Sequence, residues 1–196
     1  EQMGELVSAG TRVVLVSSGA VAAGREALGF SERPSDMASL QACASAGQAR
    51  LTQAYADVLA EQGIPCGQVL LTRRDVMDRD AFLNARTTLT RLIELGAVPV
   101  VNENDTVSTA EFAFGDNDML GALVAALVGA DLYVICSDVD GLYTANPQEV
   151  PDATLIERVE EVDHELSALA GGAGTSFGTG GMSSKLRAAR AMLAAG

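Results

Sequence analysis

Four short apolar runs, separated by helical patterns, constrain the fold of this chain more than any other feature. They occupy residues 12–17, 67–72, 97–101 and 131–136. Continuous apolar runs of this length are typical of buried parallel strands, and helical segments between them are typical of crossover connections. The sequence therefore predicts one α/β domain over residues 1–196, with a mainly parallel open sheet.

Polar residues gather where the third apolar run ends. Residues 102–105 (Asn-Glu-Asn-Asp) follow it directly, and residues 116–118 (Asp-Asn-Asp) stand just before a helical pattern at 119–128. Open α/β sheets bind ligands at the carboxyl ends of their strands. Asp and Asn also cap helices well, so residues 116–118 have a purely structural interpretation too. Together the two clusters favour a ligand that carries an ammonium group.

Composition narrows the class of protein. The chain has 26 acidic and 13 basic residues and a net charge of -13, which argues against nucleic acid or an anionic membrane as the main partner. No apolar stretch is long enough for a membrane span, and no signal peptide is visible. Cys43, Cys66 and Cys136 are predicted to be buried free thiols of a reducing, cytoplasmic compartment. A single histidine, His164, argues against a zinc or histidine-triad site, and no resident metal is predicted.

Two glycine-containing turns are candidate anion sites. Residues 17–20 (Ser-Ser-Gly-Ala) link the first apolar run to a helical pattern, where backbone N–H groups suit an anion, although a serine that only caps the helix has the same sequence. In residues 171–181 glycine holds six of eleven positions, and this stretch leads into a helix with the only lysine, Lys185. Such a loop suits phosphate groups, although a flexible linker has a similar composition. Asp138, at the end of the fourth run, is predicted to align a lysine or hold magnesium, or only to cap its own turn.

Taken together, these segments resemble the amino acid kinase family. The matching motifs run in family order over nearly the whole chain: Ser-Ser-Gly-Ala within 16–26, Leu-Leu-Thr-Arg at 70–73, Phe-Leu-Asn-Ala-Arg at 82–86, Pro-Val-Val-Asn-Glu-Asn-Asp at 99–105, Phe-Gly-Asp-Asn-Asp at 114–118, Asp-Val-Asp-Gly-Leu-Tyr-Thr at 138–144 and Gly-Thr-Gly-Gly-Met-Ser-Ser-Lys at 178–185. The resemblance implies a three-layer sandwich with helices on both faces of the sheet. It also implies transfer of a phosphoryl group from ATP, with Mg²⁺, to the γ-carboxylate of L-glutamate, the first step of proline biosynthesis. Proline as a feedback inhibitor, a homo-oligomer and a cytoplasmic location are implied as well.

The resemblance also assigns residues to roles. The glutamate pocket would contain Ser18, Gly19, Ala20, Asn102, Asp105, Asn117 and Asp118, with Asp116 beside them. The nucleotide would be bound by Ser137, Asp138, Thr179, Gly180, Gly181, Met182, Ser183, Ser184 and Lys185. Lys185 would stabilise the transferring phosphoryl group and Asp138 would orient it. The substrate carboxylate itself attacks, so no strong protein base is required.

The chain also departs from the family pattern. The family's first strand carries a Lys-x-Gly motif, which is expected to precede Glu1, and the nucleotide-binding half is expected to continue past Gly196. A partial domain, truncated at both ends and weak or inactive as a kinase by itself, is therefore expected. Two alternatives stay open: a family member acting on acetylglutamate, aspartate, carbamate or UMP, and a non-catalytic protein that binds an amino acid for regulation.

Overall fold

The computed structural model describes residues 1–108, 114, 116–147, 149–163, 166 and 181–195. The chain divides into two compact units, Glu1–Phe114 and Gly115–Gly196. None of the helices in the described part of the chain is long and apolar enough to cross a membrane.

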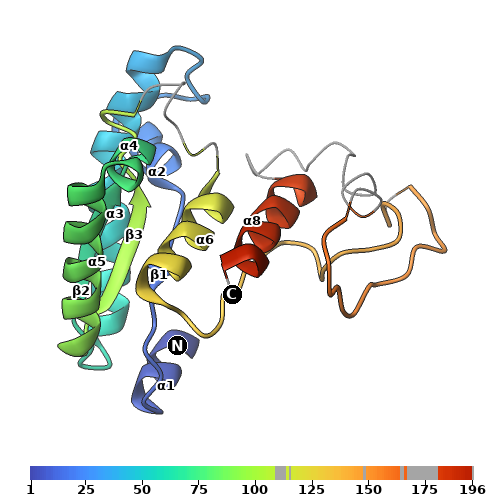
Figure 1. The fold of residues 1–196 in the computed structure, drawn as a ribbon. Helices are drawn as coiled ribbons and strands as arrows, with labels where there is room; N and C mark the ends of the chain where they lie inside the picture. Colours follow the sequence, from blue (N-terminus) through green and yellow to red (C-terminus); the bar gives the residue numbers. More distant parts are fainter. Residues whose placement is uncertain (109–113, 115, 148, 164–165, 167–180, 196) are drawn as a thin grey trace. The chain divides into compact units, whose positions relative to one another are not determined.

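The first unit is built on a three-stranded parallel sheet in the order β1-β3-β2 (Figure 1). Its elements in chain order are α1 (Gln2–Ser8), β1 (Leu15–Val16), α2 (Ala20–Ala27), α3 (Met37–Ala60), β2 (Cys66–Leu71), α4 (Arg73–Met77), α5 (Arg79–Glu94) and β3 (Val98–Glu103). The prediction of an α/β fold with a parallel sheet is confirmed.

The central strand β3 has buried residues on both faces from Val98 to Asn102, as expected for the middle of a parallel sheet. Pro99 lies inside it. The Val101 carbonyl accepts from the Ser17 N–H at 3.0 Å. The backbone N–H and C=O groups of the odd-numbered residues of β3 therefore point toward β1. Pro99 therefore removes a ladder donor on the β1 side. This explains why β1 pairs only over Leu15–Val16, although the sequence predicted a strand over residues 12–17.

Helices cover both faces of this sheet, as predicted. Cys66 and Val98 lie on one face, in a cluster with Leu59 of α3. A Cβ on the next residue of β2, Gly67, would meet the side chain of Leu92 from α5. Since successive residues of a strand point to opposite faces, α3 and α5 pack on opposite sides.

Helices α2 and α3 approach each other unusually closely. A Cβ on Gly24 would meet the backbone carbonyl of Cys43, and one on Gly47 would meet that of Ala20. Glycine at both positions allows this backbone contact. The long helix α3 continues through Gly47 without a break, because the glycine is needed for packing and not for a turn.

A short helix follows β2 in this unit. Residues 73–77 form α4, which begins with a capping box. The Thr72 hydroxyl accepts from the Asp75 N–H at 3.3 Å, and the Asp75 carboxylate accepts from the Thr72 N–H at 2.7 Å. These reciprocal bonds satisfy two donors at the helix start and favour the helix over an open turn.

The second unit contains α6 (Asn117–Val128) and α8 (Met182–Ala195), which pack side by side (Figure 1). Both were predicted as helices. The apolar α6 buries Leu120, Ala122, Val124 and Leu127.

The prediction of a fourth strand at residues 131–136 is wrong. The segment has no ladder partner in the described part of the chain, and Leu132 and Val134 are 76% and 66% exposed. An apolar run becomes a strand only when a neighbouring strand takes up its backbone groups, and sequence periodicity does not reveal that neighbour. The prediction of buried thiols fails here too: Cys43 is buried and Cys66 partly buried, but Cys136 is exposed. All three are free.

Candidate functional site

Two of the predicted site segments meet at one edge of the sheet in the first unit. Strands β1 and β3 are parallel neighbours, with Leu15 opposite Val100 and Val16 opposite Val101. The turn at 17–20 follows β1, and residues 102–105 form the last two positions of β3 and the start of the turn after it, so the two segments lie side by side at this edge. This is the edge where open α/β sheets bind ligands.

The turn after β1 presents the N-terminus of α2 without a side-chain cap. Gly19 is the N-cap residue, with φ of 112°, a left-handed conformation that suits glycine. Ser18 is not the cap, so the capping interpretation of this serine is wrong. The neighbouring Ser17 does not cap the helix either, and its hydroxyl forms a hydrogen bond with the Tyr55 hydroxyl at 2.7 Å. Backbone N–H groups in the first turn of α2 are therefore left for an anion.

Asn102 is tied into the core of the first unit. Its side chain is 3% exposed and donates to Gln48 Oε1 at 2.8 Å. Its own Oδ1 accepts from the Glu103 N–H at 2.9 Å. The amide therefore has a fixed orientation, set by a glutamine of α3 that the sequence analysis missed. Its predicted contact with glutamate stays a prediction.

Asp105 is in a different situation. It is half-buried, and none of the hydrogen bonds found among the described residues uses its carboxylate. Burial raises the pKa of Asp105, the negative charge of Glu103 raises it further, and Arg33 opposes the shift. A partly desolvated carboxylate of this kind gains from a cation.

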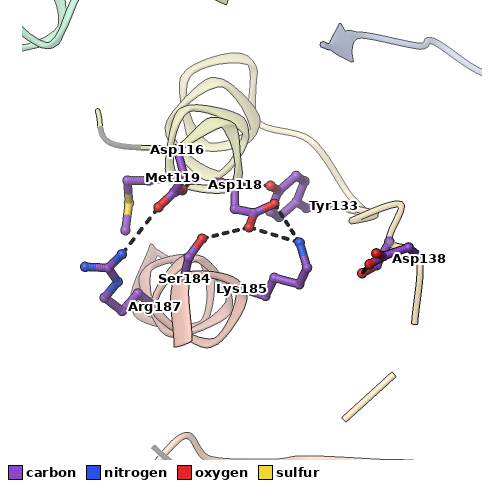
Figure 2. A network of polar contacts seen from close by, with 9 residues as sticks. Asp116, Asp118, Met119, Tyr133, Asp138, Ser184, Lys185 and Arg187 are labelled. Atoms are coloured by element: carbon purple, nitrogen blue, oxygen red, sulfur yellow. Dashed lines mark hydrogen bonds and ion pairs between the residues drawn. The ribbon is translucent and has the colours of Figure 1, made fainter. Parts of the chain in front are cut away.

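The second unit joins the lysine predicted as catalytic to a carboxylate predicted to bind substrate. Lys185 Nζ lies 3.1 Å from Oδ2 and 3.4 Å from Oδ1 of Asp118, and the Ser184 hydroxyl donates to Oδ2 at 2.7 Å (Figure 2). The side chains of Lys185 and Asp118 are only 19% and 16% exposed. An ion pair this sheltered is screened weakly by salt.

Asp116 caps α6, as its structural interpretation predicted. Its carboxylate accepts from the Met119 N–H at 2.8 Å and pairs with Arg187 of α8 at 3.3 Å. The Asp116 side chain is 7% exposed, whereas that of Arg187 is 67% exposed. Asn117 opens α6 as its first residue. The prediction that Asp116, Asn117 and Asp118 complete the glutamate pocket stays a prediction.

Tyr133, in the segment 131–136, contacts the same part of α6 as the ion pairs of Asp116 and Asp118. Its hydroxyl donates to the Asp118 backbone carbonyl at 2.8 Å, and its ring lies where a side chain on Gly121 would stand. Burial raises the pKa of Tyr133, and the charges of Asp118 and Asp116 raise it further. The hydroxyl therefore stays protonated and remains a donor over the usual range of pH.

The remaining predicted residues are distributed as follows. Ser137 and Asp138 lie on an exposed turn, and the Lys185 ammonium contacts Asp118 (Figure 2). The Gly181 carbonyl accepts from the Ser184 and Lys185 N–H groups of α8, whose first turn is formed by Met182, Ser183, Ser184 and Lys185. Thr179, Gly180 and His164 lie outside the described residues.

Three comparisons place the chain among known proteins. The sequence model of the amino acid kinase family matches residues 1–196. Glutamate 5-kinase of Pseudomonas putida (strain F1) is 56% identical over 190 residues, which are 97% of this chain and 51% of the relative. Glutamate 5-kinase of Citrifermentans bemidjiense is 52% identical over 195 residues, 100% of this chain and 52% of the relative. The chain therefore spans about half the length of the curated relatives it matches.

A solved structure of isopentenyl phosphate kinase has the same fold. The two structures superpose with a TM-score of 0.52 at 22% sequence identity. The superposition covers 85% of this chain and 74% of the isopentenyl phosphate kinase chain. At this identity the likeness concerns the fold only.

Proposed function

The chain belongs to the amino acid kinase family, and from that premise we propose that the natural protein transfers a phosphoryl group from ATP to the γ-carboxylate of L-glutamate. Its product is then L-glutamyl 5-phosphate. The relatives named glutamate 5-kinase, at 56% and 52% identity, support this choice of substrate.

The observation that carries the proposal is the ion pair of Lys185 with Asp118. Phosphoryl transfer depends on positioning and on neutralising charge, and a lysine is a mobile point charge suited to phosphate oxygens. Asp118 and Ser184 hold the first turn of α8 so that the ammonium has a defined place. We assign Asp118 to positioning Lys185. Lys185 then stabilises the transferring group.

The first unit supplies the groups that suit the amino acid. The open N-terminus of α2 favours a substrate carboxylate, and Asp105 favours the ammonium. Both stand at the edge where β1 and β3 end. A free ammonium distinguishes glutamate from acetylglutamate, whose amide nitrogen carries no charge. The geometry therefore favours glutamate over an N-acetylated or nucleotide substrate.

Magnesium would enter the site together with the nucleotide. Among the described residues no group of three or more His, Cys, Asp or Glu side chains could hold a metal. Mg²⁺ in kinases commonly takes one or two carboxylates together with substrate phosphates. Asp138 is the carboxylate that would face it, and the ion would neutralise phosphate charge during transfer.

The wider properties of such an enzyme are proposals as well. They are a place in proline biosynthesis, a cytoplasmic location, inhibition by proline in the glutamate pocket, and a homo-oligomeric state.

Trapping the product tests the proposed function. An acyl phosphate reacts with hydroxylamine to form a hydroxamate, which can be measured by its colour with iron. The complete natural protein should form it from ATP and L-glutamate, and not from N-acetylglutamate or L-aspartate. Hydroxamate formed from acetylglutamate alone would instead support another member of the family. ATP-independent binding of glutamate without any hydroxamate would support a regulatory protein.

A further inference from the structure

Glu103, the last residue of β3, is held by two donors from later in the chain. Its Oε1 accepts from the Ser108 hydroxyl at 2.7 Å and from the Phe114 N–H at 3.1 Å. Ser108 is 7% exposed, so its hydroxyl depends on this partner. One carboxylate oxygen thus links the end of the strand to two points of the segment that follows it.

Residues 104–108, which lead from Glu103 to Ser108, form a tight turn. The Ser108 N–H donates to the Asn104 carbonyl at 3.0 Å, and the Asn104 N–H extends the ladder to β2 through Leu71 at 2.9 Å. Gln41 of α3 donates to the Ser108 carbonyl at 3.0 Å. The turn is therefore fixed at its start by the sheet and at its end by Glu103 and α3.

Asp105 is carried by this turn. The charged groups that act on it are Glu103 from β3 and Arg33 from the connection between α2 and α3. Glu103 is thus both the anchor of the turn and a negative neighbour of Asp105. The two effects are separable, because hydrogen bonds and charge can be removed independently.

We propose that Glu103 is a positioning residue for the substrate: it fixes the turn that presents Asp105, and its charge strengthens the attraction of this turn for an ammonium group. The inference rests on the proposed function, in which Asp105 receives the ammonium of glutamate. Glu103 itself, engaged by Ser108 and Phe114, does not touch the substrate.

Two substitutions separate anchor from charge. Glu103→Gln keeps an oxygen that can accept from Ser108 and Phe114, but removes the charge. Ser108→Ala keeps the charge, but removes one hydrogen bond. Glu94→Gln, the same change at an exposed glutamate on α5, is the matched control.

Steady-state kinetics of the complete natural protein over a range of pH tests the proposal. Removing a like charge lowers the pKa of Asp105, so Glu103→Gln should move the acid limb of kcat/KM for glutamate to lower pH, with kcat changed less than about twofold. Ser108→Ala should leave that limb in place and raise KM about fivefold, the equivalent of one net hydrogen bond. Glu94→Gln should match the parent in both.

The proposal is overturned if Glu103→Gln gives the parent's pH profile, or if Ser108→Ala lowers kcat and leaves KM unchanged. A parent protein without glutamate-dependent turnover would reject the proposed function instead. In that case an NMR titration of the Asp105 carboxyl still tests whether the charge of Glu103 raises the pKa of Asp105. A lower midpoint in Glu103→Gln than in the parent supports it, and equal midpoints refute it.

Discussion

Asp105 and Asp118 both belong to short clusters of acids and amides, but their surroundings differ. In the second unit Asp118 is paired with Lys185 and Asp116 with Arg187, so each carboxylate has a cation from α8. In the first unit Asp105 is half-buried beside another acid, Glu103, and no ion pair or hydrogen bond among the described residues reaches its carboxylate.

This difference indicates that the two carboxylates have different roles. Where the chain supplies the cation, the carboxylate serves to place it, as Asp118 places Lys185. Where no direct ion pair or hydrogen bond among the described residues reaches the carboxylate, as at Asp105, a ligand with an ammonium group gains most by binding. We therefore propose that the first unit binds the amino acid and that the second unit acts on the phosphoryl group. Substitutions in the first unit should therefore change mainly KM for glutamate, and substitutions in the second unit should change mainly kcat.

Lys185→Met should have the largest effect. It keeps the length of the side chain and removes the charge, so kcat should fall by about 100- to 1000-fold, as for the loss of one transition-state donor. Glutamate binding should stay within about twofold of the parent value, because the ammonium acts on the phosphoryl group and not on the amino acid. Initial rates of ADP release and calorimetry measure the two quantities.

The control for this change is Arg190→Met, on an exposed position of the same helix. Its rate should match that of the parent. If Lys185→Met lost glutamate binding as well, the division between the units would fail.

Asp105→Asn should come next and act on KM. The amide cannot attract an ammonium by charge, and losing one charged hydrogen bond raises KM for glutamate about thirtyfold while kcat changes little. A fall in kcat with KM unchanged would instead place Asp105 in the transfer step.

The same variant should change stability in a pH-dependent way. Since the pKa of Asp105 is raised in the folded protein, its ionised form is disfavoured there, and the stability it contributes at low pH is lost as the pH rises through that pKa. Asp105→Asn should therefore melt at a higher temperature than the parent at pH 7. The difference should shrink as the pH falls below the ordinary carboxylate range. Melting curves at several pH values measure it.

Asp118→Asn should lower kcat about tenfold, because the amide still accepts from Ser184 but no longer holds the ammonium by charge. High salt should affect the parent little, since the pair is sheltered. Stopped assays at low and high ionic strength test both statements. A rate equal to that of the parent would show that the pair does not position Lys185.

Arg187→Gln should have the smallest effect. Its side chain is 67% exposed, and such ion pairs contribute about 0–1 kcal/mol to the free energy of unfolding. Urea denaturation should show a change within that range, and kcat should stay within about twofold of the parent. A tenfold loss of rate would mean that this ion pair, too, helps to place the reacting groups.

The sequence predicted most of the helices and the central strand because their signals are local. The apolar run at 97–101 became β3, and the periodic patterns became α3, α6 and α8. It failed at residues 131–136, where strand formation depends on a neighbour that no local pattern encodes. It could not foresee that Pro99 shortens the pairing of β1, since this follows only from the order of the strands.

The contacts among the candidate site residues could not be predicted from the sequence. Asp118 and Lys185 were singled out separately, but their contact joins residues 67 positions apart. Gln48 gave no signal, because a glutamine in an alanine-rich helix is usually a surface residue. Glu103 stood within a motif and was passed over in favour of its neighbours, since an anchoring carboxylate and a ligand-binding one look the same in a sequence.

Crossed calorimetry on the complete natural protein tests the division of labour most directly. Glutamate and a non-hydrolysable ATP analogue are titrated separately into the parent, Asp105→Asn and Lys185→Met. The account predicts that Asp105→Asn loses affinity for glutamate and keeps that for the nucleotide, while Lys185→Met keeps its affinity for glutamate. Loss of the same ligand in both variants would contradict it.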